Sequence, residues 1–77
     1  MDIEILFFGQ LTDKTGSHSI QMSNPGNIMQ LKDKLFEQFP SLELSKFVIA
    51  LNNKMVLDNA NIPDSAVIAL MPPFSGG

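Results

Sequence analysis

The sequence predicts an α+β fold, in which a mixed sheet of about five strands packs on one main helix. Three observations support this prediction: strand-length segments of alternating or continuous apolar residues, a single segment with helical periodicity, and turn residues between them. The length of 77 residues leaves room for one hydrophobic core, so we expect a single domain over residues 1–77. The chain has no Cys, so neither disulfides nor a thiolate metal site can reinforce that core.

The first predicted strands form a hairpin at the start of the chain. Apolar residues alternate over residues 2–8, which is the period of a strand. Residues 17–22 form a plausible second strand, and the polar residues 9–16 predict the turn between the two. The residues of the first strand that we expect in the core are Ile3, Ile5 and Phe7.

One helix is predicted after the turn residues 23–26. Asn27 suits the N-cap, and Gln30, three residues later, could reach back to it. Apolar residues then recur at helical spacing up to Pro40, which ends the helix because the residue before a proline avoids helical dihedrals. These apolar residues are Ile28, Leu31, Leu35 and Phe39.

Three further strands are predicted in the second half of the chain. Residues 47–51 are a continuous apolar run, and Asn52-Asn53 suits a tight turn because Asn tolerates positive φ. A short return strand at residues 55–57 and a loop precede the last strand, residues 66–71. That strand is almost entirely apolar, which predicts a central position in the sheet. A hairpin, a crossover helix and three strands that end in a central one are the β-grasp arrangement.

Strand parity also predicts an apolar outer face on the sheet. If Ile68 and Leu70 point to the core, the alternate residues of the last strand point outward, as do the even-numbered residues of the first. These outward residues either lie under a loop or form a docking surface, for which Met supplies adaptable contacts. The candidates are Leu6, Phe8, Met55, Val67, Ala69 and Met71.

Composition argues against several classes of partner. The net charge is −3, and the five Lys are spread along a chain without Arg, so we expect no nucleic-acid partner. No apolar run approaches the ~20 residues that span a bilayer. Asp2 and Glu4 stand where a signal peptide would be positive. We therefore expect no membrane partner and a cytoplasmic location.

The side chains offer no catalytic or metal-binding constellation. Ser17 and the single His, His18, would point to opposite faces of a strand, so a solvated or structural role for His18 outweighs a catalytic one. The acidic residues lack metal-ligand spacing, and the Gly residues form no phosphate-binding loop. We expect no metal site and no catalysis by this chain alone.

Residues 72–77 are the remaining candidate for chemistry, as a protruding and flexible tail. Pro72-Pro73 stiffens the exit from the last strand, and Ser75-Gly76-Gly77 has almost no side-chain bulk. Gly-rich ends are often without function, but a slim tail directly after a buried strand can thread into a narrow active site. Its carboxylate could be activated as an acyl-adenylate and then captured by sulfur as a thiocarboxylate.

Two motifs resemble a known family. Leu6-Phe7-Phe8-Gly9-Gln10 and Pro72-Pro73-Phe74-Ser75-Gly76-Gly77 are similar to segments of the small, sulfur-carrier subunit of molybdopterin synthase. The resemblance covers the whole chain and implies a ubiquitin-like β-grasp fold. It also implies that an adenylyltransferase related to ubiquitin-activating enzymes adenylates Gly77. That partner uses the ATP, and the chain itself binds no cofactor.

The resemblance further implies how the sulfur is used. The thiocarboxylate tail inserts into the large catalytic subunit of molybdopterin synthase, within a heterotetramer, and sulfur passes to cyclic pyranopterin monophosphate. Two such transfers build the dithiolene of molybdopterin. By position, Gly77 bears the sulfur. The tail-insertion residues are Pro73, Phe74, Ser75 and Gly76, and the partner-docking residues are Phe8, Met55 and Met71.

The chain departs from the family pattern at a few positions. Thr12 stands where members often have Arg, Phe74 replaces a commoner Val, and Asp64-Ser65-Ala66 replaces a usual Gly-Asp-Glu turn. These changes affect single partner contacts and leave the tail chemistry intact.

Other functions remain open for the same tail. The chain could carry sulfur for another pathway, such as thiamine synthesis or a thiolation reaction. It could also be a ubiquitin-like modifier that becomes joined to lysines, because the same acyl-adenylate can be passed to an amine. A third alternative is a structural interaction domain with an inert tail.

Overall fold

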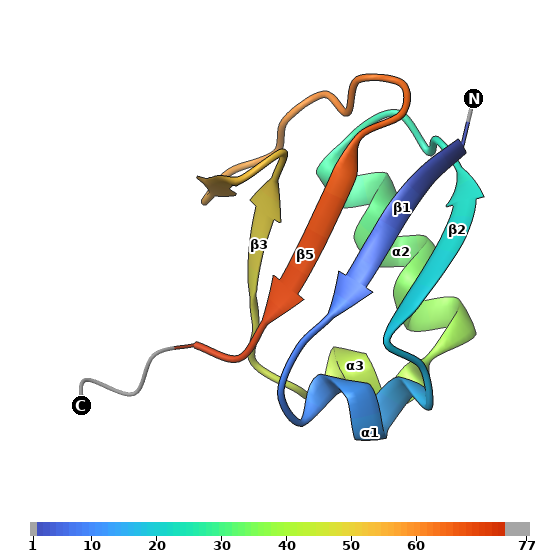
Figure 1. Ribbon diagram of the computed structural model, residues 1–77, viewed down its shortest axis with the longest axis vertical. Helices are drawn as coiled ribbons and strands as arrows, with labels where there is room; N and C mark the ends of the chain where they lie inside the picture. The colour runs from blue at the N-terminus through green and yellow to red at the C-terminus, as the bar shows by residue number, and fades with distance from the viewer. Residues whose placement is uncertain (1, 74–77) are drawn as a thin grey trace.

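The computed structural model describes residues 2–73, which form one mixed sheet and three helices (Figure 1). The strand order is β2-β1-β5-β3-β4, in which β1 and β5 are parallel and the other neighbours antiparallel. The strands are β1 (Asp2–Phe7), β2 (Ser19–Ser23), β3 (Val48–Leu51), β4 (Lys54–Val56) and β5 (Val67–Met71). The helices are α1 (Leu11–Thr15), α2 (Ile28–Gln38) and α3 (Pro40–Glu43). Residues 74–77, most of the predicted tail, lie outside the described residues.

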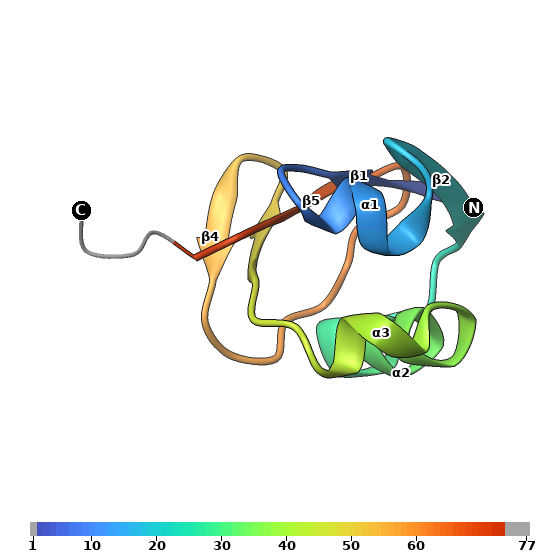
Figure 2. The ribbon, with the colours of Figure 1, turned by 90° about the horizontal axis from the view of Figure 1, so that it is seen from below.

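The core lies between the sheet and α2. Seen from below in Figure 2, α2 and α3 lie on one side of the sheet, and the described residues place no helix over the other face. The parity predicted for β1 and β5 is confirmed, because the predicted inward residues of both strands are buried. The buried core residues of the two strands are Ile3, Ile5, Phe7, Ile68 and Leu70.

Helix α2 begins where its cap was predicted. Asn27 has extended dihedrals, and its Oδ1 accepts a hydrogen bond from the backbone N–H of Gln30 at 2.9 Å. The helix ends at Gln38, before the Phe39-Pro40 step. Its apolar stripe is buried against the sheet, and the Phe39 ring meets the Phe7 ring edge-on with centroids 5.8 Å apart.

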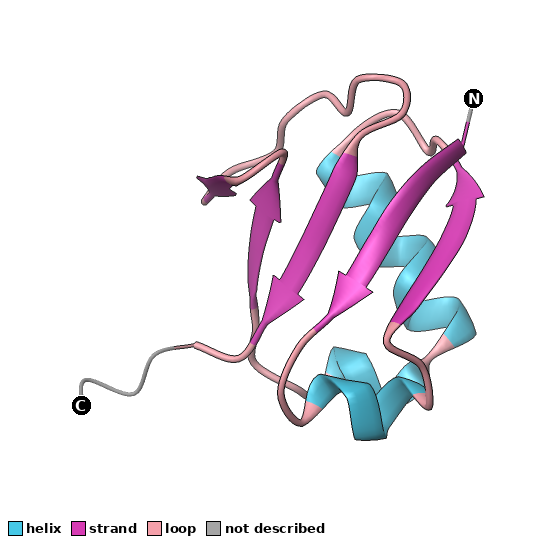
Figure 3. Ribbon diagram, in the orientation of Figure 1, coloured by secondary structure: helices cyan, strands magenta, loops and turns pink. Residues whose placement is uncertain are grey.

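The prediction of a simple polar turn between β1 and β2 was wrong, because this segment contains helix α1. Its Leu11 is 1% exposed, and burying that single apolar side chain fixes the segment against the core. Gly16 ends α1 in the left-handed conformation, with φ of 74°, and its N–H donates to the Thr12 carbonyl at 2.8 Å. The two strands still pair as an antiparallel hairpin across this insertion (Figure 3).

A second short helix, α3, was also not predicted. Pro40 was interpreted only as the end of α2, but it occupies the first turn of α3, where its missing N–H costs nothing. Leu42 on α3 is completely buried. The prediction of one main helix against the sheet is therefore confirmed, but the described residues also contain two short helices that were not predicted.

The second half of the sheet follows the predicted order. Asn52 and Asn53 both have positive φ, as expected for the turn between β3 and β4. The loop at residues 58–65 is tied to the start of α2, because the N–H of Ile28 donates to the Ala60 carbonyl and that of Ile62 to the Gly26 carbonyl, each at 2.9 Å. Strand β5 is central, as predicted, although helices cover only one of its faces.

Candidate functional site

The exit of β5 is the first part of the candidate site. Met71, the last residue of the strand, pairs with Val48, and the chain then continues through half-buried Pro72 and exposed Pro73. Neither proline can donate a hydrogen bond to the ladder, so the sheet ends here. The other predicted tail residues, Phe74, Ser75, Gly76 and Gly77, lie outside the described residues, so their roles stay predictions.

Gly9 packs directly against this exit. It has φ of +58°, and a Cβ on Gly9 would lie 2.7 Å from Cγ of Pro72 and 3.3 Å from Cδ. The N–H of Phe8 donates to the Leu70 carbonyl at 3.1 Å, which extends the pairing of β1 and β5 up to this contact. The glycine of the first motif is therefore what allows the proline of the second to approach. Both residues belong to the motifs identified in the sequence, but their contact was not predicted.

The uncovered face of the sheet is the second part of the site. The strand registers place Leu6 opposite Ala69, Ala69 opposite Ala50, and Ala50 opposite Met55. Side chains that are opposite across a sheet point to the same face, so these four form one apolar row across four strands. Ser19 on β2 continues the row beyond Leu6 and gives it a polar end.

Phe8, Met71 and Val48 lie one step further toward the exit of β5. Phe8 is 46% exposed and Met55 is 55% exposed, whereas Met71 is half-buried. The predicted parity therefore holds at all three predicted docking residues. Their role in binding a partner stays a prediction. We call the two rows together the outer face, formed by Leu6, Phe8, Val48, Ala50, Met55, Ala69 and Met71.

His18 lies at the border of the outer face. It is exposed beside a shallow hollow that Phe8, Gly9 and Thr12 also line. Its backbone carbonyl accepts a hydrogen bond from the Phe7 N–H at 2.8 Å, which places the His18 backbone in the ladder between β1 and β2. Within residues 2–73, no three His, Cys, Asp or Glu side chains are grouped to hold a metal ion, and no polar or charged side chain is buried.

An uncovered apolar face beside the exit of a strand can dock a partner and direct the following segment into it. Among residues 2–73, no helix is long and apolar enough to cross a bilayer.

Comparison with known proteins gives the family of this chain. The model of the ThiS family matches residues 5–77. The chain belongs to the ThiS family. This ThiS-family chain is 33% identical to the molybdopterin synthase sulfur carrier subunit of Arabidopsis thaliana, over 100% of the chain and 84% of that relative. The predicted membership in the family of molybdopterin synthase sulfur-carrier subunits is confirmed.

Solved structures agree on the fold. A putative molybdopterin converting factor subunit 1 from Pyrococcus furiosus superposes with a TM-score of 0.86 at 15% identity, covering 96% of this chain and 99% of the other. A chain of the complex of subunits 1 and 2 of the molybdopterin-converting factor from Helicobacter pylori gives 0.75 at 28% identity, with full coverage of both chains. The small archaeal modifier SAMP1 of Haloferax volcanii gives 0.80 at 19% identity, also with full coverage. The predicted ubiquitin-like β-grasp fold is confirmed.

Proposed function

We propose that this chain is the sulfur-carrier small subunit of molybdopterin synthase, with the Gly77 carboxylate as its working group. A carboxylate oxygen attacks the α-phosphorus of ATP, and pyrophosphate leaves. Hydrosulfide supplied by a sulfur donor then attacks the acyl carbon and displaces AMP, which leaves a thiocarboxylate. This thiocarboxylate donates sulfur to cyclic pyranopterin monophosphate during synthesis of the molybdenum cofactor.

The contact between Gly9 and Pro72 is the observation that carries this proposal. It joins the two motifs that resemble the sulfur-carrier family, and it sets the direction of the chain just before the tail. The exit lies beside the outer face, where Phe8 and Met71 flank it. A partner that binds the outer face would therefore receive the tail from a fixed point.

We assign catalysis to the partners and not to this chain. The first partner is a ubiquitin-activating-enzyme-like adenylyltransferase, which uses the ATP, and this chain binds no cofactor. The second is the large catalytic subunit of molybdopterin synthase, which the complex of subunits 1 and 2 from Helicobacter pylori supports. Phe8, Met55 and Met71 are the proposed docking residues for both partners. The heterotetramer implied by the resemblance and the cytoplasmic location expected from the sequence stay predictions.

Intact mass spectrometry tests the proposal. The chain is incubated with its activating enzyme, ATP and a sulfur donor, and its mass should rise by the difference between one sulfur and one oxygen atom. A chain that lacks Gly77 is the control and should not change. No shift in the full chain, with an enzyme that releases pyrophosphate in its presence, would contradict the proposal.

Adding a partner then separates the pathways. The large subunit and cyclic pyranopterin monophosphate should remove the sulfur from the charged carrier. If only an acceptor from the thiamine pathway removes the sulfur, the chain would instead be a sulfur carrier for that pathway. Stable conjugates to lysines in cell extract would support a modifier.

A further inference from the structure

Strand β2 is an open edge of the sheet without the usual protection against pairing. It pairs with β1 on one side, and it is the last strand in the order β2-β1-β5-β3-β4 (Figure 1). Its five residues, Ser-Ile-Gln-Met-Ser, include no charged residue and no Pro, and its register with β1 runs without a bulge. The opposite edge, β4, has only three residues and carries Lys54. Of the two edges of the sheet that residues 2–73 form, the β2 edge is therefore the longer one and the one without a charged residue, which suits it to pair with another strand.

The backbone groups at this edge follow from the ladder. The Phe7 N–H donates to the His18 carbonyl, so His18 belongs to a hydrogen-bonded pair of the antiparallel ladder. Such pairs alternate along the strand, so Ile20 and Met22 also direct their N–H and C=O toward β1. The backbone N–H and C=O groups of Ser19, Gln21 and Ser23 therefore point away from the sheet.

This pattern is self-complementary. When a second β2 strand is placed antiparallel with Gln21 opposite Gln21, Ser19 lies opposite Ser23 in both directions. All three pairs then exchange two backbone hydrogen bonds each. In the same register Ile20 lies opposite Met22, and these are the side chains of β2 that are only partly buried against the core. A single two-fold axis through the Gln21 pair would thus pair the outward backbone groups of β2 and also bring its partly buried apolar side chains into contact.

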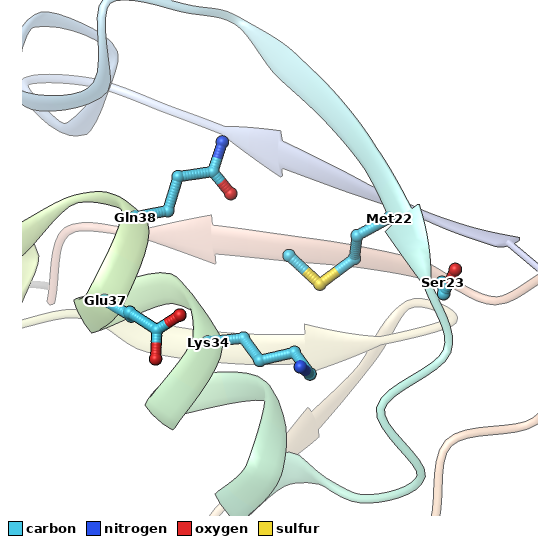
Figure 4. A pocket seen from close by; sticks show the side chains of 5 residues that line it. All are labelled: Met22, Ser23, Lys34, Glu37 and Gln38. Carbon is cyan, nitrogen blue, oxygen red and sulfur yellow. The ribbon is translucent and has the colours of Figure 1, made fainter.

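The groove under the edge fits the same partner. The groove lies between β2 and α2, and it is lined by Met22 and Ser23 of β2 and by Lys34, Glu37 and Gln38 of α2. Figure 4 shows Met22 pointing from β2 toward α2. The groove offers one positive and one negative side chain, Lys34 and Glu37. Because the groove carries both signs of charge, a second copy of the same groove would not present charges of one sign only.

We propose that the β2 edge binds a second copy of this chain, giving a dimer with a continuous sheet centred on Gln21. The outer faces of both copies lie on the same side of that sheet. Met55, on β4 at the far edge, and Pro73, beyond β5, stay accessible in each copy. The dimer is therefore compatible with partner binding at the outer face and does not depend on the proposed sulfur chemistry.

Sedimentation velocity of the full chain over a range of concentrations tests the proposal. The parent chain should shift from one to two chain masses as concentration rises. Gln21→Pro removes the central N–H, which the ladder with β1 does not use, and Pro is tolerated at the open side of an edge strand. This variant should stay monomeric, whereas Gln21→Thr, which keeps the N–H, should still dimerise. A parent chain that stays monomeric at millimolar concentration would overturn the proposal, as would a Pro variant that dimerises like the parent.

A charge pair tests the register without a proline. Gln21→Lys and Gln21→Glu each place like charges opposite one another, so each alone should be monomeric, and an equimolar mixture should form the mixed dimer. Amide hydrogen exchange gives an independent readout. The amides of Ser19, Gln21 and Ser23 should become protected at high concentration, while those of Ile20 and Met22 are protected throughout. Failure of the mixture to associate, or equal protection of all five amides at every concentration, would overturn the register.

Discussion

Replacing Gly9 with Ala should displace the exit of β5 while the sheet stays folded. The positive φ of Gly9 costs a residue with a Cβ about 1–2 kcal/mol. The new Cβ would also lie 2.7 Å from Cγ of Pro72, a separation that forces one of the two atoms to move. Relieving such overpacking costs a further ~1–3 kcal/mol. The Gly9 carbonyl accepts a hydrogen bond from the Thr12 N–H, whereas Pro72 lies beyond the last residue of β5 that pairs with a neighbour, so we expect Pro72 to move.

Gly16→Ala provides a matched control. Gly16 also has positive φ, +74°, but nothing lies within 4 Å of the position that its Cβ would take. The control therefore carries the backbone cost of about 1–2 kcal/mol without the contact. The difference in the free energy of unfolding between the two variants therefore measures the cost of the Cβ contact with Pro72, because both variants share the cost of the left-handed backbone.

Two assays separate stability from function. Urea unfolding should show a larger loss of stability for the Gly9 variant than for the Gly16 variant. At concentrations where both are folded, the Gly9 variant should form thiocarboxylate about tenfold more slowly with the activating enzyme, because a small misplacement of a reacting group is costly. Adding Pro72→Ala, which removes Cγ, should restore part of the rate. Equal stability and equal rates in the two single variants would refute the idea that this contact directs the tail.

The remaining predictions concern the outer face, the helix cap and α1. Phe8→Ser should lower the free energy of unfolding by about 1 kcal/mol or less and should weaken binding to the large subunit. The control variant Met29→Ser, which changes an exposed residue on α2, should leave that binding unchanged. An unfolded Phe8 variant would contradict the placement of Phe8 at the surface. Asn27→Ala should cost about 1 kcal/mol, because the Gln30 N–H loses its acceptor, and an unchanged urea midpoint would count against the cap. Leu11→Ala should cost ~2–5 kcal/mol, and a loss much smaller than that in urea unfolding would mean that α1 is not anchored by this side chain.

Periodicity made most of the sheet and its main helix predictable. Alternation over β1 and β5 correctly separated core from outer face, because each strand is long enough to show its period. The spacing of apolar residues and the Asn27 cap located α2, since eleven residues span about three turns. Boundaries were less accurate: the strand predicted at residues 55–57 runs over Lys54–Val56.

The two short helices were not predictable from periodicity. Helices α1 and α3 have five and four residues, hardly more than one turn, so each shows a single buried apolar residue and no repeat. Local signals were nevertheless present. Gly16 stands at the left-handed position after α1, and Pro40 stands in the first turn of α3.

The candidate site was predictable in part. Parity placed Phe8 and Met55 on the exposed side, and that placement is confirmed. The approach of Gly9 to Pro72 was not predictable, because it joins the two ends of the sequence and depends on β1 and β5 being parallel neighbours. A glycine directly after a strand was the available signal, since it allows close backbone approach as well as a turn.

Transfer of labelled sulfur tests the central claim most directly. The chain is charged at Gly77 with a heavy isotope of sulfur, purified, and mixed with the large subunit and cyclic pyranopterin monophosphate at two charged carriers for each pterin. We predict that the carrier returns to its uncharged mass and that both dithiolene sulfurs of the product carry the label. Unlabelled product, or a carrier that keeps its sulfur while molybdopterin forms, would contradict the account.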